Sequence, residues 1–89
     1  MAEYLVRVEG YVQGVGYRAF AQREAVVFGV TGFVRNLADG RVEILAQGEK
    51  DILDRFVERL REGPRMAAVH NVVIFDRVKS ADHGSFEVR

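Results

Sequence analysis

One stretch decides the fold of this 89-residue chain: "YLVRVEGYVQGVGYRAFAQREAVVF", residues 4–28. Apolar and polar residues alternate over Tyr4–Glu9, which predicts a half-buried strand. Three glycines then follow, at positions 10, 14 and 16. Over Tyr17–Phe28 the apolar residues recur at helical spacing, and Gly29 is placed to end a helix. The stretch therefore predicts a strand, a glycine-rich loop and a helix in succession.

The rest of the chain continues this alternation of strands and helices. Two strand patterns separated by turn residues predict a hairpin, and a strongly periodic apolar stripe closed by a Gly-Pro pair predicts a second helix. The expected elements are strands at Val30–Asn36 and Arg41–Gln47, a helix at about Glu49–Glu62, a strand near Val69–Val78, a polar turn over residues 80–85 and a short last strand at Phe86–Val88.

This order of elements predicts an α+β fold, the ferredoxin-like split βαβ sandwich. We expect βαββαβ plus a short C-terminal strand, with two helices on one face of a mostly antiparallel sheet. A chain of 89 residues holds one two-layer core, so residues 1–89 are expected to form a single domain. In this fold the first two strands are parallel and flank the third, which brings the glycine loop and Asn36 to one edge, about 10 Å apart.

Composition excludes several classes of function. The chain has no cysteine, and its two histidines show no metal-ligand spacing, so we expect no metal site. Thirteen basic residues balance thirteen acidic ones, which disfavours a nucleic-acid partner. No leader pattern or long apolar run is present, so we expect a cytoplasmic protein without a membrane partner. Nothing in the composition suggests more than a monomer.

The glycine loop has the properties of an anion site. Glycines allow successive main-chain N–H groups to turn inward, the following helix offers a positive end, and residues 10–17 contain no carboxylate. Arg18, at the start of the helix, adds a planar donor fork suited to phosphate oxygens. The spacing matches neither the Walker loop nor the dinucleotide fingerprint. The alternative is that the glycines only make a tight connection and that Arg18 is solvated.

Two segments resemble the signature segments of the acylphosphatase family: "GYVQGVGYR" (Gly10–Arg18) and "GFVRNLADGRVEILAQG" (Gly32–Gly48). The "GP" pair and the final "FEVR" extend the resemblance over essentially the whole chain. It implies hydrolysis of acyl phosphates to a carboxylate and inorganic phosphate, without a metal or organic cofactor. The implied ligands are a small acyl phosphate and, in the loop, inorganic phosphate or a similar anion.

The resemblance also assigns roles to residues. Arg18 is similar to the family's phosphate-binding catalytic arginine, and Asn36 to the residue that orients the attacking water. Phe33 stands where many relatives have tryptophan, a departure that leaves the expected chemistry intact. The segment similar to the phosphate cradle comprises Val12, Gln13, Gly14, Val15, Gly16, Tyr17 and Arg18.

The residues alone leave other interpretations open. Asn36 precedes a turn, and a strand-end asparagine that hydrogen-bonds its own backbone is the structural alternative to a catalytic role. A non-catalytic ferredoxin-like module is the alternative function, either an anion sensor or an RNA binder, because "TGFVRN" (residues 31–36) faintly resembles an RNA-recognition strand. Arg35 is expected on the opposite face of its strand, away from the site. No nucleophile lies near an evident base, which leaves positioning and electrostatics as the means of catalysis.

Overall fold

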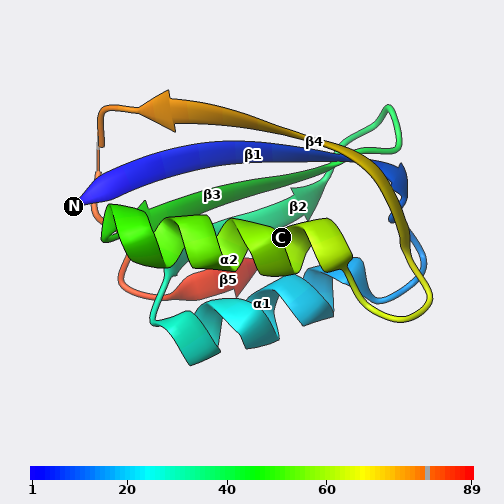
Figure 1. Ribbon diagram of the computed structural model, residues 1–89, viewed down its shortest axis with the longest axis horizontal. Helices are drawn as coiled ribbons and strands as arrows, with labels where there is room; N and C mark the ends of the chain where they lie inside the picture. Colours follow the sequence, from blue (N-terminus) through cyan, green and yellow to red (C-terminus); the bar gives the residue numbers. More distant parts are fainter. Residues whose placement is uncertain (80) are drawn as a thin grey trace.

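The computed structural model describes residues 1–79 and 81–89 of the chain. Five strands form one sheet in the order β4-β1-β3-β2-β5, and two helices cover one of its faces (Figure 1). This arrangement confirms the predicted ferredoxin-like α+β fold. Ser80, the first residue of the predicted polar turn, lies outside the described residues. In chain order the elements are β1 (Ala2–Tyr11), α1 (Tyr17–Phe28), β2 (Thr31–Asn36), β3 (Val42–Gly48), α2 (Lys50–Glu62), β4 (Ala68–Arg77) and β5 (Phe86–Val88).

Strand β3 lies between β1 and β2 and is antiparallel to both. Val42, at the start of β3, is the register partner of Val8 on one side and of Asn36 on the other. The loop after β1 and the hairpin after β2 therefore lie at the same end of the sheet (Figure 1). Strand β5 extends the sheet by pairing parallel to β2, so that the sheet is mixed.

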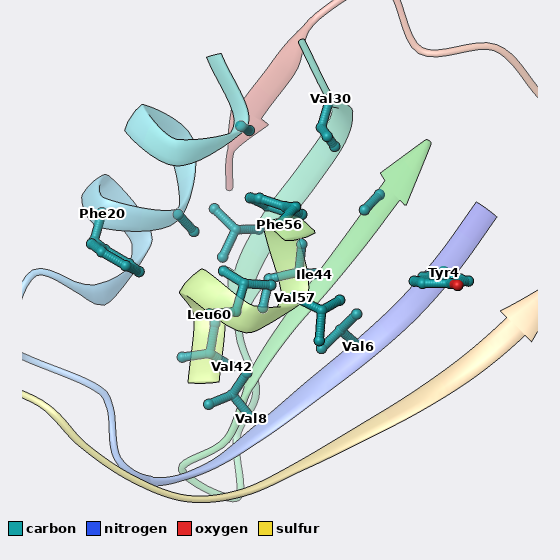
Figure 2. Close-up of a cluster of buried hydrophobic side chains, with 14 of the residues drawn as sticks. Tyr4, Val6, Val8, Phe20, Val30, Val42, Ile44, Phe56, Val57 and Leu60 are labelled. Carbon is teal, nitrogen blue, oxygen red and sulfur yellow. The ribbon is translucent and has the colours of Figure 1, made fainter. Parts of the chain in front are cut away.

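The hydrophobic core lies between the helices and the sheet (Figure 2). Alternate residues of β1 and β3, among them Val6 and Ile44, are fully buried against Phe56 and Leu60 of α2. These are the faces that the period-two and helical patterns predict. Strand β3 departs from simple alternation, because all of its residues are buried. Within residues 1–79 and 81–89, no helix is long and apolar enough to cross a membrane.

An ion-pair network lies on the face of the sheet that the helices leave uncovered. Glu43, only 4% exposed, accepts hydrogen bonds from Arg7 Nε at 3.1 Å and Arg35 Nε at 2.8 Å. Burial of the Glu43 carboxyl opposes its ionisation, but the two arginines together outweigh burial and lower its pKa. Arg35 thus points away from the helix side of β2, as strand alternation predicts.

Replacing Glu43 by glutamine tests this network. A carboxylate whose pKa is lowered by folding adds stability above its unfolded pKa, about 4.3 for Glu, and loses it as the pH falls through the folded value. We expect Glu43→Gln to unfold at lower urea concentration than the parent at pH 7, with the difference shrinking below about pH 4. An equal difference at pH 7 and pH 3 would contradict the network's role.

Gly32 in β2 approaches the backbone of β3 so closely that a side chain has no room. Its φ is 139°, and a Cβ at this position would lie 1.8 Å from the Leu45 carbonyl oxygen. We expect Gly32→Ala to lower the free energy of unfolding by about 3 kcal/mol or more. Gly29→Ala is the matched control, since its φ of 69° is also positive but its Cβ would meet no described atom within 4 Å. The free energy of unfolding of that control should fall by about 1 kcal/mol. Equal losses in the two variants would show that the close approach of Gly32 to the backbone of β3 is not the cause.

Candidate active site

A pocket of about 280 Å³ opens at the end of the sheet where β1 and β2 stop. It combines residues of the glycine loop, the first turns of α1, the last residue of β2 and one residue of β5. The two segments that the sequence analysis expects to meet, the loop and Asn36, therefore share one pocket. Its lining comprises Val12, Gly14, Gly16, Tyr17, Arg18, Ala19, Gln22, Asn36 and Val88.

The loop between β1 and α1 turns through two glycines in the left-handed conformation. Gly14 has a φ of 75° and Gly16 a φ of 80°, values that glycine adopts without a steric penalty. A Cβ added at either position would meet no described atom within 4 Å. Backbone conformation is thus what requires glycine here, and the space beside the loop remains open to a ligand.

Gly16 is also the N-cap of α1, and it leaves the positive end of that helix unblocked. Among the described residues, no side chain caps this end, and the first turn contains no acidic residue. The first helical bond runs from Phe20 N to Gly16 O at 3.0 Å. The main-chain N–H groups of residues 17–19 therefore precede the first helical donor, have no acceptor within the helix, and are suited to an anion.

Arg18 is the one charged residue in the lining of this pocket, as far as the described residues show. Its side chain is half-exposed, and Nη1 donates a hydrogen bond of 2.9 Å to the main-chain oxygen of Arg89. Arg89 is itself held to β2, because its N–H donates to Val34 O at 2.8 Å. The segment after β5 thus orients a guanidinium that has five N–H donors in all.

Asn36 is the last residue of β2 and is exposed to solvent in the pocket. It lies two residues after Val34, which is fully buried on the helix side, so both share that side of the strand. A carboxamide has both donor and acceptor groups and carries no charge. The pocket therefore contains both the neutral amide of Asn36 and the cationic guanidinium of Arg18.

Four other cradle residues offer no free polar side-chain group to the pocket. Val12 and Tyr17 line the pocket but are buried in the core, and the Tyr17 hydroxyl donates to Leu60 O at 2.6 Å. Burial raises the pKa of the Tyr17 phenol, so it stays protonated as this donor. Gln13 and Val15 do not belong to the lining. Any contact of these four with an anion would come from their main-chain groups.

Three lining residues were not predicted from the sequence: Ala19, Gln22 and Val88. Gln22 lies four residues after Arg18 on α1, so helical spacing would have found it. Its Nε2 donates to Phe86 O at 3.2 Å. Val88 reaches the pocket because it is the register partner of Val34 in the parallel β2–β5 pair. That long-range pairing has no counterpart in the local sequence pattern.

The two histidines lie apart from this pocket. His70 is exposed on β4, and the ring of His83 packs against Phe33 with centroids 5.9 Å apart. Over residues 1–79 and 81–89, no three His, Cys, Asp or Glu side chains gather in an arrangement that would hold a metal ion. The chemical groups that the pocket offers are main-chain N–H groups, one guanidinium and two carboxamides.

Known proteins are similar to this chain in both sequence and fold. The acylphosphatase family model matches residues 4–88. An acylphosphatase of Thermus thermophilus is 49% identical over 83% of this chain and 84% of its own length. The crystal structure of acylphosphatase from Bacillus subtilis has a TM-score of 0.97 and 38% identity, covering 100% of this chain and 99% of that one. A structure of an acylphosphatase from Coxiella burnetii has a TM-score of 0.93 and 41% identity, covering 99% and 92%. The chain belongs to the acylphosphatase family.

Proposed function

We propose that the chain is a hydrolase that cleaves the carboxyl-phosphate anhydride of acyl phosphates in the pocket between the glycine loop and Asn36. One observation carries the proposal: a single pocket combines an open helix N-terminus, Arg18 and Asn36. The similarity to proteins named acylphosphatase supports the same activity. It also makes an anion sensor or RNA-binding module the less favoured alternative.

The phosphoryl group is held by the cradle. Main-chain N–H groups of the segment from Val12 to Arg18 and the Arg18 guanidinium donate to its oxygens. These donors are fixed by the fold before the substrate arrives, so little reorganisation is needed as charge develops. Each well-placed donor is worth about 3 kcal/mol in the transition state. Arg18 acts both in binding and in stabilising the transferred group.

Asn36 holds the attacking water through its donor and acceptor groups without repelling the phosphate. The water oxygen bonds to phosphorus as the bond from phosphorus to the acyl oxygen breaks, and the electron pair leaves on the carboxylate. Both protons of the water end on inorganic phosphate. The conjugate acid of the departing carboxylate has a pKa of about 4, so the carboxylate leaves without a general acid.

We further propose that residues 1–89 act as one domain, as a cytoplasmic monomer that uses no metal. A chain without cysteine suits a reducing compartment, and its balanced charge gives no general attraction to nucleic acid.

Turnover of acetyl phosphate should be unchanged by a chelator, and light scattering should report the mass of one chain. Loss of turnover with chelator would overturn the metal-free mechanism.

Asn36→Ala tests the role of the carboxamide. We expect kcat for acetyl phosphate to fall about 100-fold, because the water loses its orienting partner. Competitive inhibition by inorganic phosphate should stay close to the parent's, since the cradle and Arg18 are untouched. Asn71→Ala, at an exposed asparagine of β4, is the matched control and should leave both quantities unchanged. Full turnover by Asn36→Ala would remove Asn36 from the mechanism.

Arg18→Ala should lose phosphate inhibition and turnover together, because the one cation of the pocket is gone. We expect kcat/KM to fall by about 1000-fold. Arg18→Lys retains the charge without the planar fork and should recover only part of the loss. Arg23→Ala, at an exposed arginine of the same helix, controls for the change in net charge. If Arg18→Ala still binds phosphate normally, another group holds the anion.

A further inference from the structure

The side chain of Gln13 joins the two halves of the site. Its Nε2 donates one hydrogen bond to Leu37 O at 2.8 Å and a second to Arg41 O at 2.9 Å. A primary amide nitrogen has two protons, so both are engaged. Because both neighbours are carbonyl oxygens, only the nitrogen side of the carboxamide suits this position. The Gln13 side chain is therefore committed to the β2–β3 hairpin rather than to the pocket.

The two acceptors of Gln13 are the closing residues of that hairpin. Leu37 N donates to Arg41 O at 2.8 Å, and Gly40 N donates to Leu37 O at 3.2 Å. Leu37 follows Asn36 directly in the chain, and Asn36 is the last residue of β2. A shift of the hairpin relative to the cradle would therefore move the carboxamide of Asn36 relative to the bound phosphate.

We propose that Gln13 is a positioning residue, which sets the distance and direction from the phosphate cradle to the water-binding carboxamide of Asn36. The inference rests on the proposed function, because it gives Gln13 an effect on catalysis through Asn36. Gln13 lies next to Gly14 in the cradle and is tied to the residue next to Asn36, so its side chain spans the two parts directly. The β1–β3–β2 ladder connects the same parts only through its last register pairs, Val8↔Val42 and Asn36↔Val42.

This geometry separates Gln13 from a residue that binds phosphate itself. The cradle turns through Gly14 and Gly16, whose positive φ values glycine adopts without a steric penalty. Loss of the carboxamide should thus leave the anion bound and misplace the water. A small misplacement of a reacting group costs up to about 100-fold in rate.

The test begins with Gln13→Leu, which keeps a similar volume and removes both donors. We expect kcat for acetyl phosphate to fall roughly 10- to 100-fold, with inhibition by inorganic phosphate little changed. Gln47→Leu is the matched control. Gln47 is buried at the other end of β3, where its carboxamide donates to Glu3 and to Ala81 O. Its loss should lower the melting temperature and leave kcat unchanged.

The decisive measurement is a double-mutant cycle with Asn36→Ala. If Gln13 acts by placing Asn36, then Gln13→Leu in the Asn36→Ala background should lower kcat by less than about twofold further. A full additional loss in that background, with weaker phosphate inhibition, would show that Gln13 contacts the phosphate and would overturn the proposal. A normal kcat in Gln13→Leu with only a lower melting temperature would assign it a structural role and overturn it as well.

Failure of the proposed function is distinguishable from failure of this inference. No turnover by the parent protein would overturn the proposed function and the Gln13 inference with it. Full turnover by Asn36→Ala would remove Asn36 from the mechanism and overturn the Gln13 inference, while the hydrolase activity itself would stand. Normal turnover by Gln13→Leu, when Asn36→Ala is impaired, would overturn only the role of Gln13. Hydrogen exchange adds an independent measurement, because the amides of Leu37 and Gly40 should exchange faster in Gln13→Leu. Unchanged exchange there would contradict the tie to the hairpin.

Discussion

The site depends on β3 running antiparallel between β1 and β2. Val42, buried at the start of β3, has Val8 of β1 and Asn36 of β2 as its two register partners. This arrangement makes β1 and β2 parallel, so that both end at the same edge of the sheet (Figure 1). The glycine loop and Asn36 come from segments about twenty residues apart in sequence, and only this pairing makes them neighbours. A slip of β3 by one residue would turn Glu43 and Gln47 towards the core and Val42 and Ile44 away from it, so the core disfavours that register.

The electrostatics of the pocket set the substrate class. One guanidinium and a set of main-chain N–H groups provide positive charge and partial charge in fixed positions. Such donors stabilise charge on a transferred phosphoryl group without rearranging during the reaction. They offer no proton to a departing group, because the lining formed by the described residues contains no carboxyl or imidazole. A carboxylate departs unaided, whereas the alkoxide of a phosphate monoester would need a proton. An acyl phosphate is therefore the substrate that fits this set of groups.

Hydrophobic periodicity in the sequence predicts most of the fold and the two segments that form the site, the glycine loop and the end of β2. The alternating pattern of β1 and the helical pattern of α1 position the glycine loop, and alternation in β2 places Arg35 on the face opposite Asn36. Two features escape this reasoning. Val88 enters the pocket through the β2–β5 pairing, which depends on contacts distant in sequence. Hydrophobic periodicity does not predict where the Gln13 side chain points, because a residue in an irregular loop belongs to no repeating face. The sequence pattern therefore predicts which backbone segments meet, and tertiary contacts decide what each loop side chain does.

Most of the side-chain ties described around the pocket are neutral, unlike the ion pairs on the uncovered face of the sheet. The buried carboxylate of Glu43 and its two arginines lie on the uncovered face of the sheet. Around the pocket, three neutral side chains donate to main-chain oxygens, namely Gln13, Gln22 and the protonated Tyr17. The charged Arg18 makes the same kind of bond to Arg89 O. A carboxylate in their place could not donate these hydrogen bonds and would add a negative charge to the surroundings of the pocket. In the proposed mechanism, these neutral side chains add no charge beside the site, and Arg18 is the charge that the substrate meets.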